Sequence, residues 1–242
     1  MILTGGSGAK LVVNGDILIK EDGKRLYKQA IKQERFYNNC APYKVPRIFS
    51  ISTKDNRCSI SMEYIQNAQE ISKDQSIGHF YNLTAFFSTI LLPQSTETTI
   101  HKSQFQDKLA GIELPLDLFQ YAQGILNDCQ IKIPYLHGLN HGDFTTNNIL
   151  FDGKEYWLID FLDTFINSPL QDYSKLFQEL IINNQPLKPY INALNLIQLH
   201  EYKTFINLSS LFNFLRMFPY LPTGERKNKI KQIIENEQWI IA

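Results

Sequence analysis

Short runs of β-favouring apolar residues, separated by turn residues, fill much of the first 65 positions of the chain. Residues 11–13 and 17–19 flank Asn14 and Gly15, a dipeptide typical of a tight β-hairpin turn. Residues 24–39 differ, because their apolar side chains recur at helical spacing with charges between them. Two more strand-like runs follow, at 47–53 and 59–65. The pattern predicts a small, mostly antiparallel sheet with one helix.

Helical spacing dominates the rest of the chain. It extends over 74–92 and 115–130, and the Ser/Thr-rich stretch at 93–103 between them is typical of a loop. Short strands return over 141–163. After residue 170, four apolar-periodic segments broken by prolines predict further helices.

Length and composition fit two ordered lobes. The chain has 242 residues, of which 43% are hydrophobic and 12% aromatic. We expect an α+β fold with a small antiparallel-sheet amino lobe over residues 1–65 and a larger helical carboxyl lobe over residues 66–242. Lysine plus arginine and aspartate plus glutamate each number 24, so the formal net charge is zero. Because nucleic-acid-binding proteins normally carry a basic excess, no nucleic-acid partner is expected.

Cysteine content and hydropathy bear on the compartment. Cys40, Cys58 and Cys129 are odd in number and lack CxxC spacing, which argues against a disulfide framework or a zinc site. The first residues lack the basic start and long apolar run of a signal peptide, and the apolar run at 85–92 is too short to span a bilayer. We expect a cytoplasmic protein without membrane insertion, and the oligomeric state stays open.

Residues 141–150 are the most informative about chemistry. They read His-Gly-Asp-Phe-Thr-Thr-Asn-Asn-Ile-Leu, and Ile-Asp-Phe follows at 159–161. Phosphoryl transfer from a magnesium nucleotide needs a carboxylate beside the attacking hydroxyl and oxygen ligands that hold Mg²⁺ against the phosphates. Asp143 and Asn148 on one loop can supply both, and Asp160 on the next hairpin completes the set. The alternative is a turn in which these side chains only satisfy backbone groups.

These segments resemble the catalytic and metal-binding segments of the aminoglycoside phosphotransferases, choline kinases and related small-molecule kinases, which have a protein-kinase-like fold. The resemblance implies that Asp143 is the catalytic base, and that Asn148 and Asp160 are magnesium ligands. It also implies structural support of the loop by His141 and a bracing role for Asp172. An ordinary acidic residue at a helix N-terminus is the alternative for Asp172.

The amino lobe offers groups for the nucleotide. A glycine loop with Gly6, Ser7 and Gly8 lies between two predicted strands and could bring backbone N–H groups to phosphates, but a plain hairpin has the same composition. In the order and spacing of this fold, Lys20 matches the lysine that pairs nucleotide phosphates. Glu34, on the following helix, matches its ion-pair partner. Taken alone, either residue would be an ordinary surface charge.

The last amino-lobe strand ends with Met62, Glu63, Tyr64 and Ile65. This segment resembles the hinge that holds adenine through backbone N–H and C=O groups in these kinases. Met62 would then face the base and Ile65 would cover it. A buried edge strand predicts the same residues, so both interpretations stay open.

Two departures from protein kinases bear on the acceptor. Gly142 stands where those enzymes have arginine, and no glycine follows Phe161, which argues against a phosphorylated activation loop and for a small acceptor. Asp163 could face the cleft or cap the turn. Aromatic residues near the C-terminus could cage a choline-type cation, but their helical spacing favours a core role. They are Tyr202, Phe205, Phe212, Phe214, Phe218 and Tyr220.

The function implied by the resemblance is transfer of the γ-phosphate of ATP, or of GTP, with Mg²⁺ to a hydroxyl group of a small molecule. A sugar, an amino alcohol or an aminoglycoside would be such an acceptor. The alternatives are a protein or peptide kinase of the same fold and a catalytically silent nucleotide-binding scaffold.

Overall fold

The chain folds into two compact units. Residues 1–93 and 141–165 form the first, and residues 94–140 and 166–242 form the second. A computed structural model describes residues 2–4, 9–37, 39–40, 42–71, 85–185, 187–188 and 199–240. The loop at 141–148 therefore folds with the amino-terminal sheet, in one unit. The lobe boundary at residue 65 stays a prediction.

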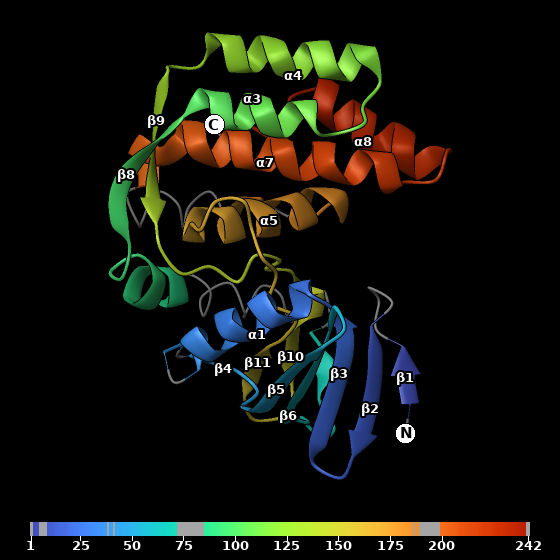
Figure 1. Cartoon of the computed structure of the whole chain (residues 1–242). Coiled ribbons are helices and arrows are strands. Elements are labelled where there is room, and N and C mark those ends of the chain that lie inside the picture. The colour runs from blue at the N-terminus through green and yellow to red at the C-terminus, as the bar shows by residue number, and fades with distance from the viewer. Residues whose placement is uncertain are drawn as a thin grey trace. The chain divides into compact units, whose positions relative to one another are not determined.

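The first unit contains a five-stranded antiparallel sheet with the strand order β1-β2-β3-β6-β5 (Figure 1). Its strands are β1 (Ile2–Thr4), β2 (Lys10–Asn14), β3 (Ile17–Gly23), β5 (Ile48–Lys54) and β6 (Arg57–Glu63). The predicted hairpin is confirmed, because Asn14 pairs with Ile17 and Gly15 has the positive φ of +59° that such a turn needs. The β5–β6 turn uses Asp55 and Asn56, with φ of +48° and +66°.

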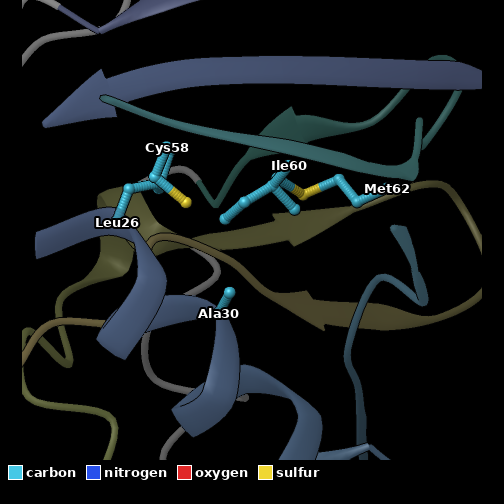
Figure 2. Packing of buried hydrophobic residues seen from close by; sticks show 5 residues of the cluster. All are labelled: Leu26, Ala30, Cys58, Ile60 and Met62. Atoms are coloured by element: carbon cyan, nitrogen blue, oxygen red, sulfur yellow. The ribbon is translucent and has the colours of Figure 1, made fainter. Parts of the chain in front are cut away.

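Helix α1 (Arg25–Phe36) packs one face against this sheet and confirms the helix predicted over 24–39. Figure 2 shows Leu26 and Ala30 of α1 beside Cys58, Ile60 and Met62 of β6. The geometry follows from the spacing, since residues four apart share a helix face and residues two apart share a strand face. All five are at most 7% exposed, so they form the core of the sheet and helix.

A second sheet of the first unit carries the chain from the loop at 141–148 to Asp160. Its strand order is β4-β11-β10-β7, with β4 (Tyr43–Lys44), β7 (Gln69–Glu70), β10 (Ile149–Phe151) and β11 (Tyr156–Leu158). Strands β10 and β11 form an antiparallel hairpin in which Ile149 lies opposite Leu158. The short strands predicted within 141–163 are thereby confirmed.

An aromatic cluster joins the segments of the first unit. It consists of Phe36, Tyr43, Phe86, Phe87, Phe144 and Phe161, all at most 3% exposed. The ring centroids of Phe36 and Phe161 lie 5.1 Å apart, as do those of Tyr43 and Phe86. Burial of these rings holds α1 against the segments that contain Phe144 and Phe161. Phe87 begins the π-helical stretch η2 (Phe87–Leu91). This stretch lies at the described end of the helix predicted over 74–92, of which residues 74–84 lie outside the described residues.

The second unit combines helices with a two-stranded antiparallel sheet, β8 (Thr96–His101) and β9 (Lys132–His137). Its described helices are α3 (Lys102–Ala110), α4 (Leu116–Asp128), α5 (Pro169–Ile182), α7 (Lys203–Met217) and α8 (Glu225–Glu235), with the 3-10 turns η4 (Leu199–Tyr202) and η5 (Phe218–Tyr220). Ser174 Oγ of α5 donates to the Ile206 carbonyl of α7 at 3.1 Å. None of the helices in the described ranges is both long and apolar enough to cross a membrane.

Two sequence interpretations of the second unit have clear outcomes. The loop expected over 93–103 is wrong for most of its length, because β8 pairs there with β9, about 36 residues further along. The C-terminal aromatic residues mostly serve the core, with Phe205 and Phe214 fully buried, whereas Tyr220 is 88% exposed. The α+β class predicted for the chain is confirmed.

Candidate active site

The loop at 141–148 brings Asp143 and Asn148 side by side. A 3-10 turn, η3 (Thr146–Asn148), curls the chain back toward Asp143. Asn148 Nδ2 donates to the Asp143 carbonyl oxygen at 2.8 Å and to carboxylate Oδ2 at 3.0 Å. The amide oxygen of Asn148 is therefore directed away from Asp143.

Asp160 returns to this loop through the β10–β11 hairpin. The Ile159 N–H donates to the Asn148 carbonyl at 3.0 Å, so the two segments lie next to each other. Lys20, within β3, donates from Nζ to Asp160 Oδ1 at 2.6 Å. The Lys20 side chain is 11% exposed and that of Asp160 is 54% exposed. The structure thus joins, from three distant segments, the lysine, the carboxylates and the amide that the sequence singled out.

His141 is fully buried and bridges the loop and the hairpin. Its Nε2 donates to the Ile159 carbonyl at 2.7 Å, and its Nδ1 accepts from the Asp143 N–H at 3.3 Å. This pattern requires the neutral ring with its proton on Nε2. Burial lowers the pKa of His141 to about 4, which keeps that form at neutral pH. The contacts are those of a residue that supports the loop.

The oxygen atoms of Asn148 and Asp160 suit a magnesium ion that is bound together with phosphates. Mg²⁺ takes oxygen ligands and usually relies on one or two carboxylates plus substrate phosphates. Within the described residues, no group of three or more His, Cys, Asp or Glu side chains could hold a metal ion. One amide oxygen and one solvent-exposed carboxylate fit an ion that arrives with a nucleotide.

A cavity of about 150 Å³ opens beside Lys20 and Asp160 in the first unit. Strand register explains one wall, since Leu11 lies opposite Lys20 and Lys20 lies opposite Ile60. Directly opposed residues point to the same face of a sheet, which brings these side chains together. All four predicted hinge residues also line the cavity: Met62, Glu63, Tyr64 and Ile65.

The chain is similar to known phosphotransferases in part of its sequence and in its fold. Residues 96–201 match the phosphotransferase enzyme family. The aminoglycoside phosphotransferase APH(4)-Ia is similar in structure, with a TM-score of 0.64 and 14% identity over 97% of this chain and 92% of that chain. An amicoumacin kinase in complex with AMP-PNP, Ca²⁺ and Ami gives a TM-score of 0.62 and 12% identity over 100% of this chain and 86% of that chain.

A choline/ethanolamine kinase family protein from Mesorhizobium loti gives a TM-score of 0.55 and 15% identity, covering 99% of this chain and 89% of that chain. No curated protein matches the sequence. The resemblance to the aminoglycoside phosphotransferase and choline kinase family is confirmed. The match to the phosphotransferase family and the shared fold also support the expected kinase-type phosphotransferase with an alcohol group as acceptor. The family match includes the loop at 141–148 and Asp160.

Within this phosphotransferase fold, the structure does not bring Glu34 to Lys20. Glu34 is exposed on α1, whereas Gln33 is 6% exposed and lines the cavity. The Lys20 ammonium contacts Asp160 instead. Leu26, Ala30 and Gln33 follow the spacing i, i+4, i+7, and this stripe is the signal that could have located the inward position.

The remaining predicted residues are Asp172, Asp163 and those of the glycine loop. Asp172 is fully buried in the first turn of α5, where Ser168 Oγ caps the helix by accepting from the Leu170 N–H at 3.2 Å. Asp163 lies 3.2 Å from Lys28 Nζ, and both side chains are exposed. The predicted phosphate loop lies outside the described residues, with Gly6, Ser7 and Gly8.

The hinge donates two of its N–H groups within the protein. The Glu63 N–H donates to the Arg47 carbonyl at 2.8 Å, and the Tyr64 N–H donates to the Asp16 carbonyl at 2.9 Å. A base could use those two donors only by breaking these bonds. The next amide along the cavity wall is that of Ile65.

Sequence reasoning missed several apolar residues of the cavity: Leu11, Leu18, Leu150 and Ile159. Strand alternation contained part of the signal. Leu18 lies two residues before Lys20 on β3, so the two side chains share a face of that strand. The pairing of the strands determines which face that is.

Proposed function

We propose that the chain is an ATP-dependent kinase that moves the γ-phosphate to a hydroxyl group of a small molecule. The convergence of Lys20, Asp143, Asn148 and Asp160 in one unit carries this proposal. These are the cation, the base and the metal ligands that phosphoryl transfer from a nucleotide requires.

The chemistry needs one bond broken and one formed. The bond between the γ-phosphorus and the oxygen that bridges it to the β-phosphate breaks, and the acceptor oxygen bonds to that phosphorus. The Asp143 carboxylate orients the acceptor hydroxyl and takes its proton. Asn148 Nδ2 donates to Asp143 Oδ2 at 3.0 Å and so helps to orient this carboxylate on the loop.

The phosphates would meet two sources of positive charge. Asn148 and Asp160 would hold Mg²⁺, which neutralises phosphate charge when bound. Lys20 Nζ, now 2.6 Å from Asp160 Oδ1, would pair with phosphate oxygens. The apolar cavity residues, with the hinge, would bind the base.

Two observations support a small acceptor over a protein. Gly142 leaves no room for the arginine through which protein kinases read a phosphorylated loop, because a Cβ there would overlap the Leu162 carbonyl oxygen. The similar structures include an amicoumacin kinase in complex with AMP-PNP, Ca²⁺ and Ami. The acceptor class proposed is a sugar, an amino alcohol or an aminoglycoside.

A nucleotide-consumption screen with purified protein tests the proposal. Sugars, amino alcohols, nucleosides, aminoglycosides and a generic protein substrate would each be offered with ATP and Mg²⁺, and products identified by mass spectrometry. We expect a phosphorylated small molecule, with no product from Asp143→Asn. Transfer to protein alone would favour a protein kinase. Metal-independent nucleotide binding without transfer to any class would favour a scaffold.

A further inference from the structure

The segment directly after Phe161 is held by backbone and side-chain contacts within the first unit. The Leu162 N–H donates to the His141 carbonyl at 3.0 Å. The Leu162 carbonyl accepts from Lys32 Nζ, on α1, at 2.7 Å. The backbone N–H of Leu162 is therefore bonded to the loop at 141–148, and its carbonyl is bonded to α1.

Gly142 makes the second contact possible. A Cβ at this position would overlap the Leu162 carbonyl oxygen, so the absence of a side chain lets the two backbones approach. The carbonyl is enclosed between the Gly142 backbone and the Lys32 ammonium group. Hydrogen bonds from a charged donor are stronger than those between neutral groups, which makes Lys32 an effective clamp.

Lys32 and Lys28 differ in what they hold, although they lie one turn apart on α1. Lys32 is partly buried, and its Nζ also lies 3.4 Å from Thr164 Oγ1. Lys28 forms a pair with Asp163 at 3.2 Å, in which both side chains are exposed. Exposed pairs contribute little to stability, so Lys28 serves as a natural comparison for Lys32.

The clamp matters because of the backbone at Asp160, two residues before Leu162. Asp160 has a φ of +58°, a left-handed conformation that is uncommon for a residue with a side chain. Such a conformation persists where the flanking structure holds it. On one flank, Ile159 is bonded through both its N–H and its carbonyl. On the other flank, Leu162 is bonded in the same two ways.

We propose that Lys32 is a positioning residue that latches the 162–164 segment to α1 and thereby holds the Asp160 carboxylate in place for the nucleotide-bound metal ion. The latch consists of the contacts of Lys32 with Leu162 and Thr164, and it requires no covalent modification of the chain. The inference rests on the proposed function, since it takes Asp160 to be a metal ligand.

Metal titration of three variants tests the latch. Lys32→Met removes the donor and keeps the aliphatic stem, Lys32→Arg restores a charged donor, and Lys28→Met is the control from the same helix. The first readout is the Mg²⁺ concentration for half-maximal ATP consumption with the acceptor found in the screen. The second is Mn²⁺ binding to the complex with AMP-PNP, which needs no acceptor and no turnover.

Lys32→Met should weaken metal binding about tenfold in both readouts, as losses of groups that orient a metal ligand typically do. AMP-PNP affinity without metal should stay within about twofold, Lys32→Arg should recover most of the loss, and Lys28→Met should match the wild type. Equal metal binding by Lys32→Met and the wild type, or equal losses in Lys28→Met, would overturn the latch.

Failure of the proposed function has a different signature. The wild type would then bind Mn²⁺ no better with AMP-PNP than without it and would phosphorylate no acceptor. If Lys32→Met does not fold, as judged by urea unfolding, Lys32→Gln keeps a neutral donor and should give an intermediate loss of metal affinity. Unchanged metal affinity in a folded Lys32→Gln would also count against the latch.

Discussion

At position 142, both the backbone conformation and the packing favour glycine. Its φ is +94°, and a Cβ would overlap the Leu162 carbonyl oxygen. In the sequence this glycine is only a departure from the arginine of protein kinases. In the structure it is a packing requirement, because any side chain would separate the loop at 141–148 from the segment after Asp160.

Gly142→Ala should destabilise the fold more than Gly153→Ala does. Gly153 also has a φ of +94°, but no atom lies within 4 Å of a Cβ built there. Gly153→Ala should cost about 1–2 kcal/mol from backbone strain. Gly142→Ala should cost roughly 3 kcal/mol or more, because the backbone must also move. Urea unfolding measures both, and equal losses would contradict the packing argument.

Asp143→Asn should separate nucleotide binding from phosphoryl transfer. The amide keeps an oxygen that can accept from Asn148 Nδ2 but cannot take a proton at neutral pH. Transfer should fall about 10²–10⁴-fold, while affinity for AMP-PNP stays within a few-fold. Single-turnover kinetics and isothermal titration measure the two quantities.

Lys20→Ala provides the contrast to that variant. The Lys20 ammonium group is proposed to contact the phosphates already in the ground state. Nucleotide affinity should therefore fall together with the transfer rate in Lys20→Ala. If Asp143→Asn transferred phosphate normally, Asp143 would not be the base.

Strand β6 links the core to the cavity. Cys58, Ile60 and Met62 lie at every second position of this strand and face α1 (Figure 2). Ile60 and Met62 also line the cavity. Packing and nucleotide binding are therefore expected to respond together when this strand face changes.

Ile60→Ala should lower the free energy of unfolding by about 2–5 kcal/mol, because it removes buried methyl groups and leaves a cavity. It should also weaken AMP-PNP binding, since Ile60 lines the proposed base pocket beside Lys20. Ser59→Ala, on the other face of β6, should stay within about 0.5 kcal/mol. Urea unfolding and isothermal titration check the pair. A nucleotide affinity unchanged in Ile60→Ala would exclude Ile60 from the base pocket.

Elements were predictable where their signals are local. The residues that form the Asn14-Gly15 turn are adjacent in the sequence, and those of the stripe on α1 lie only three or four positions apart. Strand β8 gives no such signal, because Ile100 is its one buried residue and the alternation needed to recognise a strand is missing. Its pairing with β9 depends on a partner beyond α3 and α4.

The proposed site joins three segments that are far apart in the chain. Lys20 and Asp160 are 140 positions apart, yet their side chains form an ion pair. Each segment alone carries an ordinary set of polar residues. The site exists because β3, the 141–148 loop and the β10–β11 hairpin belong to one compact unit.

Removing divalent metal should abolish phosphoryl transfer, and Asp160→Ala should do so even in excess Mg²⁺. The reason is that the phosphate charge would then lack its counter-ion. Asn148→Ala should lose less, on the order of tenfold in rate, because a neutral ligand contributes less than a carboxylate. Coupled assays across a Mg²⁺ titration measure these effects. Wild-type turnover by Asp160→Ala in excess chelator would show that the metal assignment is wrong.

Much of the site could be read from residue types and local spacing. The loop at 141–150 and Asp160 point to phosphoryl transfer because few other chemistries need a carboxylate and an amide at that spacing before a second carboxylate. The α+β class follows from runs of strand and helix spacing in the same way. These features depend on residues that are close together in the sequence, so secondary-structure propensity and turn chemistry predict them without reference to distant parts of the chain.

Packing decided which of the candidate side chains meet. A single step along α1 rotates the side chain by about 100°, so the choice between Gln33 and Glu34 depends on how the helix is rotated against the sheet. Burial of Leu26 and Ala30 on β6 sets that rotation, which turns Gln33 inward and leaves Glu34 exposed. Lys20 then pairs with Asp160, a partner that strand register and hairpin closure supply and that sequence spacing alone does not specify.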